Sequence, residues 1–280
     1  MLKFSMMSLC LSEFQTSEEV VKTALSLGLK GIDWTSAAFR DDPPEFLNRI
    51  STDAGLKVVC YIPFLTKLSR GEGGGEDELK WELDRAVGVG SDKVLVPTMP
   101  IPGLRDLGEI RKRWMEVLNR TAAECAERNL IPTIENFPGE YSPVVTAEDF
   151  LAFQRQIPSL RLTFDAGNAF TGEDPVESFR RTFEFIVHMH FKDFHVRAAS
   201  APGFWRGRDG RWYRPALIGE GAIDHSRMLR AVLESGYSGW GNIEYEASDL
   251  PRETGIRRAC ASLRQIVSQI QPMEQERGSI

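Results

Sequence analysis

The sequence predicts an α/β protein made of one (β/α)8 TIM barrel. Its 280 residues come close to the roughly 250 typical of such a barrel. Short apolar strands alternate eight times with amphipathic helices, a pattern typical of parallel strands. No Gly-x-Gly-x-x-Gly motif follows the first strand, which argues against an open dinucleotide-binding sheet. Together these observations favour a closed barrel.

The first half of the chain contains four strand–helix units. The first helix is expected to begin near Thr16, because Thr16 and Glu19 have the spacing of a capping box, and to end at Gly28. The strands are predicted at residues 3–9, 31–35, 57–62 and 93–97. The three later helices are predicted at residues 44–54, 77–87 and 107–128.

The second half repeats the pattern four more times. Its strands are predicted at residues 131–136, 161–165, 186–192 and 241–246. Its helices are predicted at residues 147–156, with Thr146 as the N-terminal cap, and at 175–185, 225–235 and 251–270. Residues 1–270 are therefore expected to form the barrel domain, and residues 271–280 a polar, frayed tail.

Two segments interrupt the regular alternation. Residues 66–77 contain four glycines but lack the Gly-Lys-Ser/Thr of a phosphate-binding loop, so they are expected to form a flexible surface loop or a mobile lid. Residues 195–216 delay the seventh helix, and Asp209-Gly210 within them predicts a β-hairpin. The insertion is rich in arginine, which could bind a substrate carboxylate or phosphate, contact a partner subunit or remain solvated (Arg197, Arg206, Arg208, Arg211 and Arg214).

Composition excludes several classes of partner. The formal net charge of −6 gives no general affinity for nucleic acid or for an anionic membrane surface. No apolar run approaches the roughly 20 residues of a membrane helix. Residues 1–14 lack the apolar core and cleavage site of a signal peptide, and the four cysteines are far apart. We therefore expect a reduced, cytoplasmic protein.

Polar side chains stand at the ends of the last four predicted strands, where barrel enzymes place their catalytic residues. Glu135 and Asp165 end two of these strands, and side-chain alternation points both into the barrel. The seventh strand offers His188 and His190 on its inner face, and the eighth offers Glu244 and Glu246. Any single one of these residues could be a cap, an ion-pair partner or a buried core residue.

Such a set would be costly to bury without a cation. Carboxylates combined with an imidazole suit Mn²⁺, Mg²⁺ or Co²⁺, with Zn²⁺ as a further option, better than copper or an iron–sulfur centre. The strand ends therefore predict a site for one divalent metal ion.

Four stretches carry a family resemblance. They are Ile-Glu-Asn at 134–136, Phe-Asp-Ala-Gly-Asn at 164–168, His-Met-His-Phe-Lys-Asp at 188–193 and Gly-Glu-Gly-Ala-Ile-Asp at 219–224. These motifs resemble the sugar phosphate isomerase/epimerase superfamily, the xylose isomerase-like TIM barrels. The resemblance covers nearly the whole chain and is strongest between residues 131 and 246.

The resemblance implies Glu135, Asp165, His190 and Glu244 as the metal ligands. It also implies that Glu135 and Glu244 act as an acid/base pair on an enediolate, in a sugar isomerase or epimerase. Lys192 would neutralise an oxyanion, or instead pair with Asp165 or Glu135. The remaining expected substrate contacts are Asn136, Asn168, His188, Glu246 and Arg206. Asn168 stands where family members often have a histidine, so a mechanism that needs that histidine is in doubt.

Three other readings remain open. A dehydratase acting on a keto-inositol or a dehydroshikimate-like substrate would use the same proton abstraction and then expel a hydroxyl group. An endonuclease IV-like nuclease needs a three-metal cluster rich in histidine, whereas this chain has four histidines, none before the seventh strand. A non-catalytic sugar-binding barrel would predict a broken ligand set. The expected partner is a small sugar or polyol, and a homo-oligomer is the further alternative.

Overall fold

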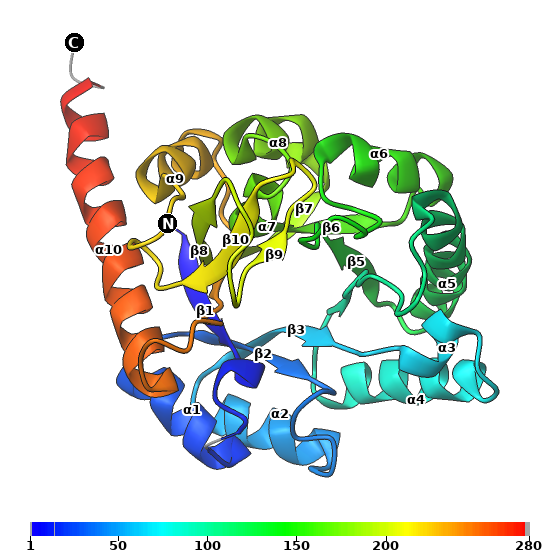
Figure 1. Ribbon diagram of the computed structural model, residues 1–280. Coiled ribbons are helices and arrows are strands. Elements are labelled where there is room, and N and C mark those ends of the chain that lie inside the picture. The colour runs from blue at the N-terminus through cyan, green and yellow to red at the C-terminus, as the bar shows by residue number, and fades with distance from the viewer. Residues whose placement is uncertain (1, 14, 278–280) are drawn as a thin grey trace.

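A computed structural model describes residues 2–13 and 15–277 of the chain. The main sheet is a closed barrel of parallel strands in the order β1-β11-β7-β6-β5-β4-β3-β2, which confirms the predicted fold. Figure 1 shows the barrel surrounded by its helices. The strands are β1 (Lys3–Met7), β2 (Gly31–Thr35), β3 (Lys57–Ile62), β4 (Lys93–Val96), β5 (Ile131–Glu135), β6 (Arg161–Asp165), β7 (Ile186–Phe191) and β11 (Trp240–Ile243).

Eight longer helices connect the strands and close the chain within the described residues. They are α1 (Ser17–Ser26), α2 (Pro44–Asp53), α4 (Gly75–Gly88), α5 (Leu107–Glu127), α6 (Ala147–Gln156), α8 (Pro175–Thr182), α9 (His225–Glu234) and α10 (Arg252–Arg277). The short helices are η1 (Ser8–Cys10), α3 (Thr66–Arg70), α7 (Ala166–Phe170) and η2 (Phe183–Phe185). Both predicted N-terminal caps are present: Thr16 forms its capping box with Glu19, and Thr146 forms one with Asp149.

Side-chain alternation gives these barrel strands one apolar face and one polar face. Ile134, Phe164 and Met189 are fully buried in the main hydrophobic core, where each large apolar side chain contributes about 1.5–3 kcal/mol. The alternate positions are buried as well but polar: the hydroxyl groups of Thr133 and Thr163 lie 2.9 Å apart in a hydrogen bond. The predicted division between apolar and polar faces of these strands is thus confirmed.

Several predicted boundaries need correction. The first strand was expected to reach residue 9 but ends at Met7, and η1 follows it. The last strand ends at Ile243, so Glu244 and Glu246 lie just beyond it. The glycine-rich segment is largely helical, because α3 occupies its start and α4 begins at Gly75.

The predicted C-terminal tail also differs. The backbone of residues 271–277 continues α10 instead of fraying, and the helix extends past the barrel in Figure 1. Residues 278–280 of that predicted tail lie outside the described residues.

The insertion forms the predicted hairpin. In a small antiparallel sheet, β10 (Trp212–Ala216) pairs with both β8 (Asp193–Arg197) and β9 (Trp205–Arg206). Of the two turn residues, only Gly210 adopts a positive φ, at 84°. The backbone N–H of Glu140 donates to the Arg206 carbonyl at 3.0 Å, and that of Asp209 donates to the Thr171 carbonyl at 3.1 Å. These bonds fasten the hairpin to the loops that follow β5 and β6.

Over residues 2–13 and 15–277, no helix combines the length and the apolar composition needed to cross a membrane. All four cysteines are free and buried, where each packs as a small apolar side chain.

Candidate metal centre

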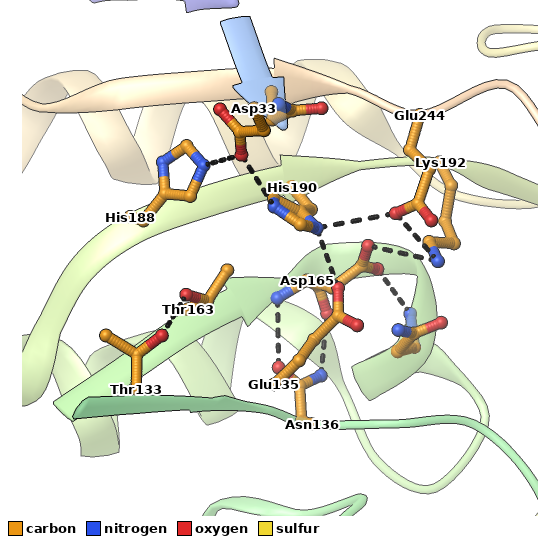
Figure 2. Close-up of polar contacts among 12 residues, drawn as sticks. Asp33, Thr133, Glu135, Asn136, Thr163, Asp165, His188, His190, Lys192 and Glu244 are labelled. Atoms are coloured by element: carbon orange, nitrogen blue, oxygen red, sulfur yellow. Dashed lines mark hydrogen bonds and ion pairs between the residues drawn. The ribbon is translucent and has the colours of Figure 1, made fainter. Parts of the chain in front are cut away.

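The four predicted ligands come together at the C-terminal ends of four neighbouring strands. Glu135 ends β5, Asp165 ends β6, His190 lies near the end of β7, and Glu244 follows β11. Each offers a ligand atom within 4.8 Å of the others, and all four side chains are buried. Figure 2 shows the carboxylates converging on the His190 ring.

His190 links two layers of the barrel interior. Its Nδ1 atom faces the carboxylates, 2.8 Å from Glu135 Oε1 and 3.4 Å from Glu244 Oε2. Its Nε2 atom faces the opposite way and lies 3.5 Å from Asp33 Oδ2. Nδ1 is therefore the nitrogen placed to bind a metal, and a carboxylate behind Nε2 is the usual support for such a ligand.

Asp33 belongs to a second buried group. Its Oδ2 atom also lies 2.6 Å from His188 Nε2, and Asp33, His188 and His190 each offer a ligand atom within 4.8 Å of the other two. The short Asp33–His188 hydrogen bond already occupies these atoms. We therefore interpret this group as the support beneath the ligand cluster.

Lys192 places a cation among the acids. Its Nζ atom lies 2.9 Å from Glu244 Oε2, 3.3 Å from Glu246 Oε1 and 3.6 Å from Asp165 Oδ2. Because Lys192 is itself buried, its charge is poorly screened by water. The ion pair with Asp165 that the sequence left open is present, and two glutamates join it.

The charges in this cluster shift its acids in opposite directions. Burial raises the pKa of Asp165 well above its ordinary value, and the nearby charges of Glu135 and Glu244 reinforce the rise against Lys192. Burial also opposes ionisation of Glu244, but Lys192 and His190 outweigh it and hold the pKa of Glu244 well below its usual range. The pKa of His190 is well raised: burial works against its charge, but Glu135 and Asp33 prevail. Such opposed shifts are characteristic of functional sites.

One oxygen in the cluster points to a missing partner. Asp165 Oδ1 accepts the backbone N–H of Asn168 at 2.7 Å, whereas Asp165 Oδ2 has no hydrogen-bond partner among the described residues and has only the 3.6 Å ion pair with Lys192 Nζ. An unsatisfied buried carboxylate oxygen is costly. Oxygen-rich donors with one imidazole nitrogen fit a hard or borderline divalent cation, so the residues present fit the predicted metal ion.

The predicted substrate contacts have different surroundings. The side-chain amide of Asn136 donates to the Asp165 carbonyl at 2.7 Å and accepts the Asp165 N–H at 2.9 Å, so it joins β5 to β6. His188 is bound to Asp33 below the ligands. Asn168 is buried, and within residues 2–13 and 15–277 neither of its side-chain polar atoms has a partner, so it is the amide left available.

Glu246 and Arg206 lie at the rim. The side chain of Glu246 is 41% exposed despite its contact with Lys192. Arg206 is 50% exposed and pairs with Glu140 at 2.6 Å. The structure brings Glu246 close to the ligand cluster, whereas Arg206 lies in the hairpin with its charge already balanced.

Asp33 is the residue that sequence reasoning missed. It lies inside β2, away from the strand end, next to a register shift between Ile32 and Asp33. A signal was present, because Gly31, Asp33 and Thr35 alternate with the large residues Ile32 and Trp34. That alternation places a carboxylate on the inner face of the strand.

Comparison with known proteins identifies the family. The family model of the xylose isomerase-like TIM barrel matches residues 21–266, so the chain belongs to this family. The inosose dehydratase of Lacticaseibacillus casei is 36% identical over 109 residues, which cover 36% of this chain and 36% of that protein. The match thus spans about a third of the relative's length.

Solved structures share the fold. L-ribulose 3-epimerase superposes with a TM-score of 0.73 at 16% identity, covering 100% of this chain and 99% of that one. A xylose isomerase-like TIM barrel protein from Mycobacterium smegmatis, in complex with magnesium, gives a TM-score of 0.70 at 18% identity, covering 96% and 97%. At such identities the likeness establishes the architecture alone.

Proposed function

We propose that Glu135, Asp165, His190 and Glu244 hold one divalent metal ion, and that the protein is a sugar isomerase or epimerase that moves a proton next to a carbonyl group. The observation that carries the proposal is that Glu135 Oε1 and Glu244 Oε2 both lie close to His190 Nδ1, at 2.8 and 3.4 Å. Mn²⁺, Mg²⁺, Co²⁺ and Zn²⁺ all suit this donor set.

The metal ion would polarise the carbonyl oxygen of a keto-sugar and so acidify the neighbouring C–H bond. Glu135 and Glu244 come from β5 and from the end of β11, with β6 and β7 between them in the barrel. One carboxylate can therefore remove a proton from one side of a substrate, and the other can return a proton to the opposite side. General acid–base catalysis of this kind contributes about 10²- to 10⁴-fold.

Lys192 and Asn168 would complete the chemistry. The Lys192 ammonium, held among Glu244, Glu246 and Asp165, is placed to stabilise negative charge that develops on the substrate. The unpartnered amide of Asn168 would orient a hydroxyl group by hydrogen bonding. Neither role requires the histidine that Asn168 replaces.

A dehydratase is the second candidate, supported by the inosose dehydratase relatives. The first step would be the same proton abstraction, followed by loss of a hydroxyl group from the adjacent carbon. Glu246 suits this second step: although its side chain is 41% exposed, its partial burial together with the charges of Glu244 and Glu135 raises its pKa to about 7. A carboxyl group with that pKa can donate a proton to a leaving hydroxyl near neutral pH.

Metal content tests the site. Wild type, Glu244→Gln and Glu246→Gln are incubated with Mn²⁺, desalted and measured by elemental analysis. We expect about one metal per chain in wild type and in Glu246→Gln, and a marked loss in Glu244→Gln. If wild type retains no metal, the proposed function fails. If Glu246→Gln loses the metal and Glu244→Gln retains it, the fourth ligand is Glu246 and not Glu244.

The reaction is tested with the metal-loaded protein. Ketoses and keto-inositols are incubated in D₂O and followed by proton NMR and ultraviolet absorbance. Deuterium at the carbon next to the carbonyl, with a new isomer, identifies an isomerase or epimerase. Loss of water with a new conjugated carbonyl identifies a dehydratase.

A further inference from the structure

Two hollows meet at the rim of the barrel, and Glu246 lines both of them. The first, of about 400 Å³, contains Glu244 together with Met7, Cys10 and Pro215. The second, of about 470 Å³, lies between the loop after β5 and the hairpin. Each alone falls within the roughly 300–1,000 Å³ of small-molecule sites. Side by side, they offer more room than one sugar ring needs.

The second hollow has an aromatic lining. Phe137, Tyr141 and Trp205 line it with Pro100 and Pro138, and these aromatic side chains are only partly buried. Aromatic faces provide flat apolar area at low conformational cost, and they suit the C–H face of a sugar ring or an aromatic ring. The hollow is thus built to receive a ring.

Trp205 is held rigidly in this wall. Its ring stacks on Tyr213 with centroids 5.3 Å apart and an interplanar angle of 26°. Tyr213 is fully buried, and its hydroxyl group donates to Asp209 Oδ2 at 2.6 Å. Phe194 packs edge-on against both rings. The hairpin therefore holds Trp205 in place before any ligand arrives.

The charged residues of the second hollow favour a neutral ligand. Arg206 contacts Glu140 at 2.6 Å, so its guanidinium is already balanced. Glu246, where the two hollows meet, is acidic and contacts Lys192. A phosphate group in this hollow would meet an Arg206 guanidinium that is already paired and would lie near the acidic Glu246. A neutral ring with hydroxyl groups would contact aromatic faces and could form hydrogen bonds at their edges.

We propose that the hollow lined by Trp205 is a subsite for the second ring of a glycoside, whose reacting sugar occupies the hollow beside Glu244. The inference rests on the proposed function and narrows its substrate class to glycosides whose second ring is neutral. It also gives the insertion a role, because the insertion supplies Trp205.

Binding of simple glycosides tests the subsite. Phenyl and methyl glucopyranosides and galactopyranosides, in both anomers, are titrated calorimetrically into the Mn²⁺-loaded protein. We expect at least one phenyl glycoside to bind about tenfold more tightly than its methyl counterpart, since an aromatic contact of this kind is worth about that factor. Trp205→Ala should reduce the difference to within about twofold, and Trp205→Phe should keep most of it.

Trp212→Ala is the matched control. Trp212 lies on the same hairpin, but strand alternation turns it away from the face of its neighbour Tyr213, and it does not line the hollow. This variant should retain the full phenyl preference. The subsite is rejected if no glycoside of the panel binds, if phenyl and methyl glycosides bind alike to wild type, or if the two tryptophan variants behave alike.

Metal content of the same samples separates the two proposals. Trp205→Ala should keep its Mn²⁺, because it lies outside the ligand cluster, but it should lower the Tm, because the packing of Trp205 on Tyr213 and Phe194 is lost. Loss of the phenyl preference in a protein that retains metal supports the subsite. Wild-type protein without metal rejects the proposed function, whereas a metal-loaded wild type without phenyl preference rejects the subsite alone.

Discussion

Asp165 and Asp193 are both buried aspartates near the C-terminal rim, yet their surroundings are opposite. Asp193 accepts backbone N–H groups from Phe194, Gly219, Gly221 and Ile223 at 2.8–3.2 Å. Asp165 accepts one from Asn168, and among the described residues its other oxygen has no hydrogen-bond partner. Their pKa values shift accordingly, upward for Asp165 and downward for Asp193.

This difference teaches how to separate two kinds of buried acid. A carboxylate saturated by backbone donors holds a loop in place; here Asp193 holds the Gly-Glu-Gly segment at 219–221. A carboxylate left partly unpaired among like charges is poised to bind a cation. Asp165 is the last residue of β6 and Asp193 comes shortly after the end of β7, so both lie near strand ends, and their hydrogen bonds distinguish them.

The largest effect is expected for Asp165→Asn. Removing this ligand should weaken Mn²⁺ binding by more than the roughly 10- to 100-fold that loss of a supporting residue costs. Without metal, the free energy of unfolding should change by less than about 1 kcal/mol, since the lost charge was poorly stabilised. Urea unfolding with and without Mn²⁺ measures both. A large destabilisation of the metal-free protein would contradict the distinction from Asp193.

Asp193→Asn should show the reverse pattern. Losing a buried carboxylate with several backbone donors should lower the free energy of unfolding by about 2–4 kcal/mol at pH 7, with Mn²⁺ affinity unchanged. Burial would raise the pKa of Asp193, but His225 and the backbone N–H groups of Gly219 and Ile223 hold it below the ordinary 3.8.

The sign of the pH dependence follows from that shift. The stabilisation is fully present above the unfolded-state pKa and is lost as the pH falls through the lower folded-state pKa. The stability gap between wild type and Asp193→Asn should therefore narrow below pH 3.8. Asp224→Asn is the control, because Asp224 caps α9 and asparagine caps helices equally well. A gap that stays constant with pH would show that the charge of Asp193 is not what stabilises the loop.

Asp33 extends the comparison to the support beneath the ligands. If Asp33 orients His190 through Nε2, Asp33→Ala should weaken Mn²⁺ binding by about 100-fold and Asp33→Asn, which keeps an acceptor, by about 10-fold. The visible absorption of the Co²⁺-loaded protein should shift in both variants, because the ring of a metal ligand has moved. If Asp33→Ala leaves both the Mn²⁺ affinity and the Co²⁺ spectrum unchanged, Asp33 does not orient His190 and interacts only with His188.

Local patterns in the sequence predicted most of the barrel. Hydrophobic periodicity and the capping signals at Thr16 and Thr146 located the helices, and strand alternation pointed Glu135, Asp165 and His190 toward one another. These signals depend on residues only a few positions apart, so they can be recognised in the sequence before the fold is known. The ligand role itself stays a prediction until metal is measured.

Long-range contacts account for what the sequence could not predict. The contact of Asp33 with His188 joins residues 155 positions apart, and no local pattern encodes it. The amide of Asn136 looked available for substrate, but the backbone of Asp165 on the next strand occupies it. Trp205 borders a hollow only because the hairpin folds onto the loop after β5. Each outcome depends on which strands and loops become neighbours when the barrel closes.

The smallest effect is expected from Thr133 and Thr163, which lie one inward position below Glu135 and Asp165 and satisfy each other. Either Thr→Val change leaves one buried hydroxyl unpaired and should cost about 1 kcal/mol, whereas the double change removes both and should cost less than the sum. A double-mutant cycle by urea unfolding measures the coupling. Mn²⁺ affinity should stay constant in all three variants, because the two neutral hydroxyl groups are hydrogen-bonded to each other and are not metal ligands. If either single variant weakens metal binding, the positions of Glu135 and Asp165 depend on the Thr133–Thr163 hydrogen bond. The functional site would then include this deeper layer of the barrel.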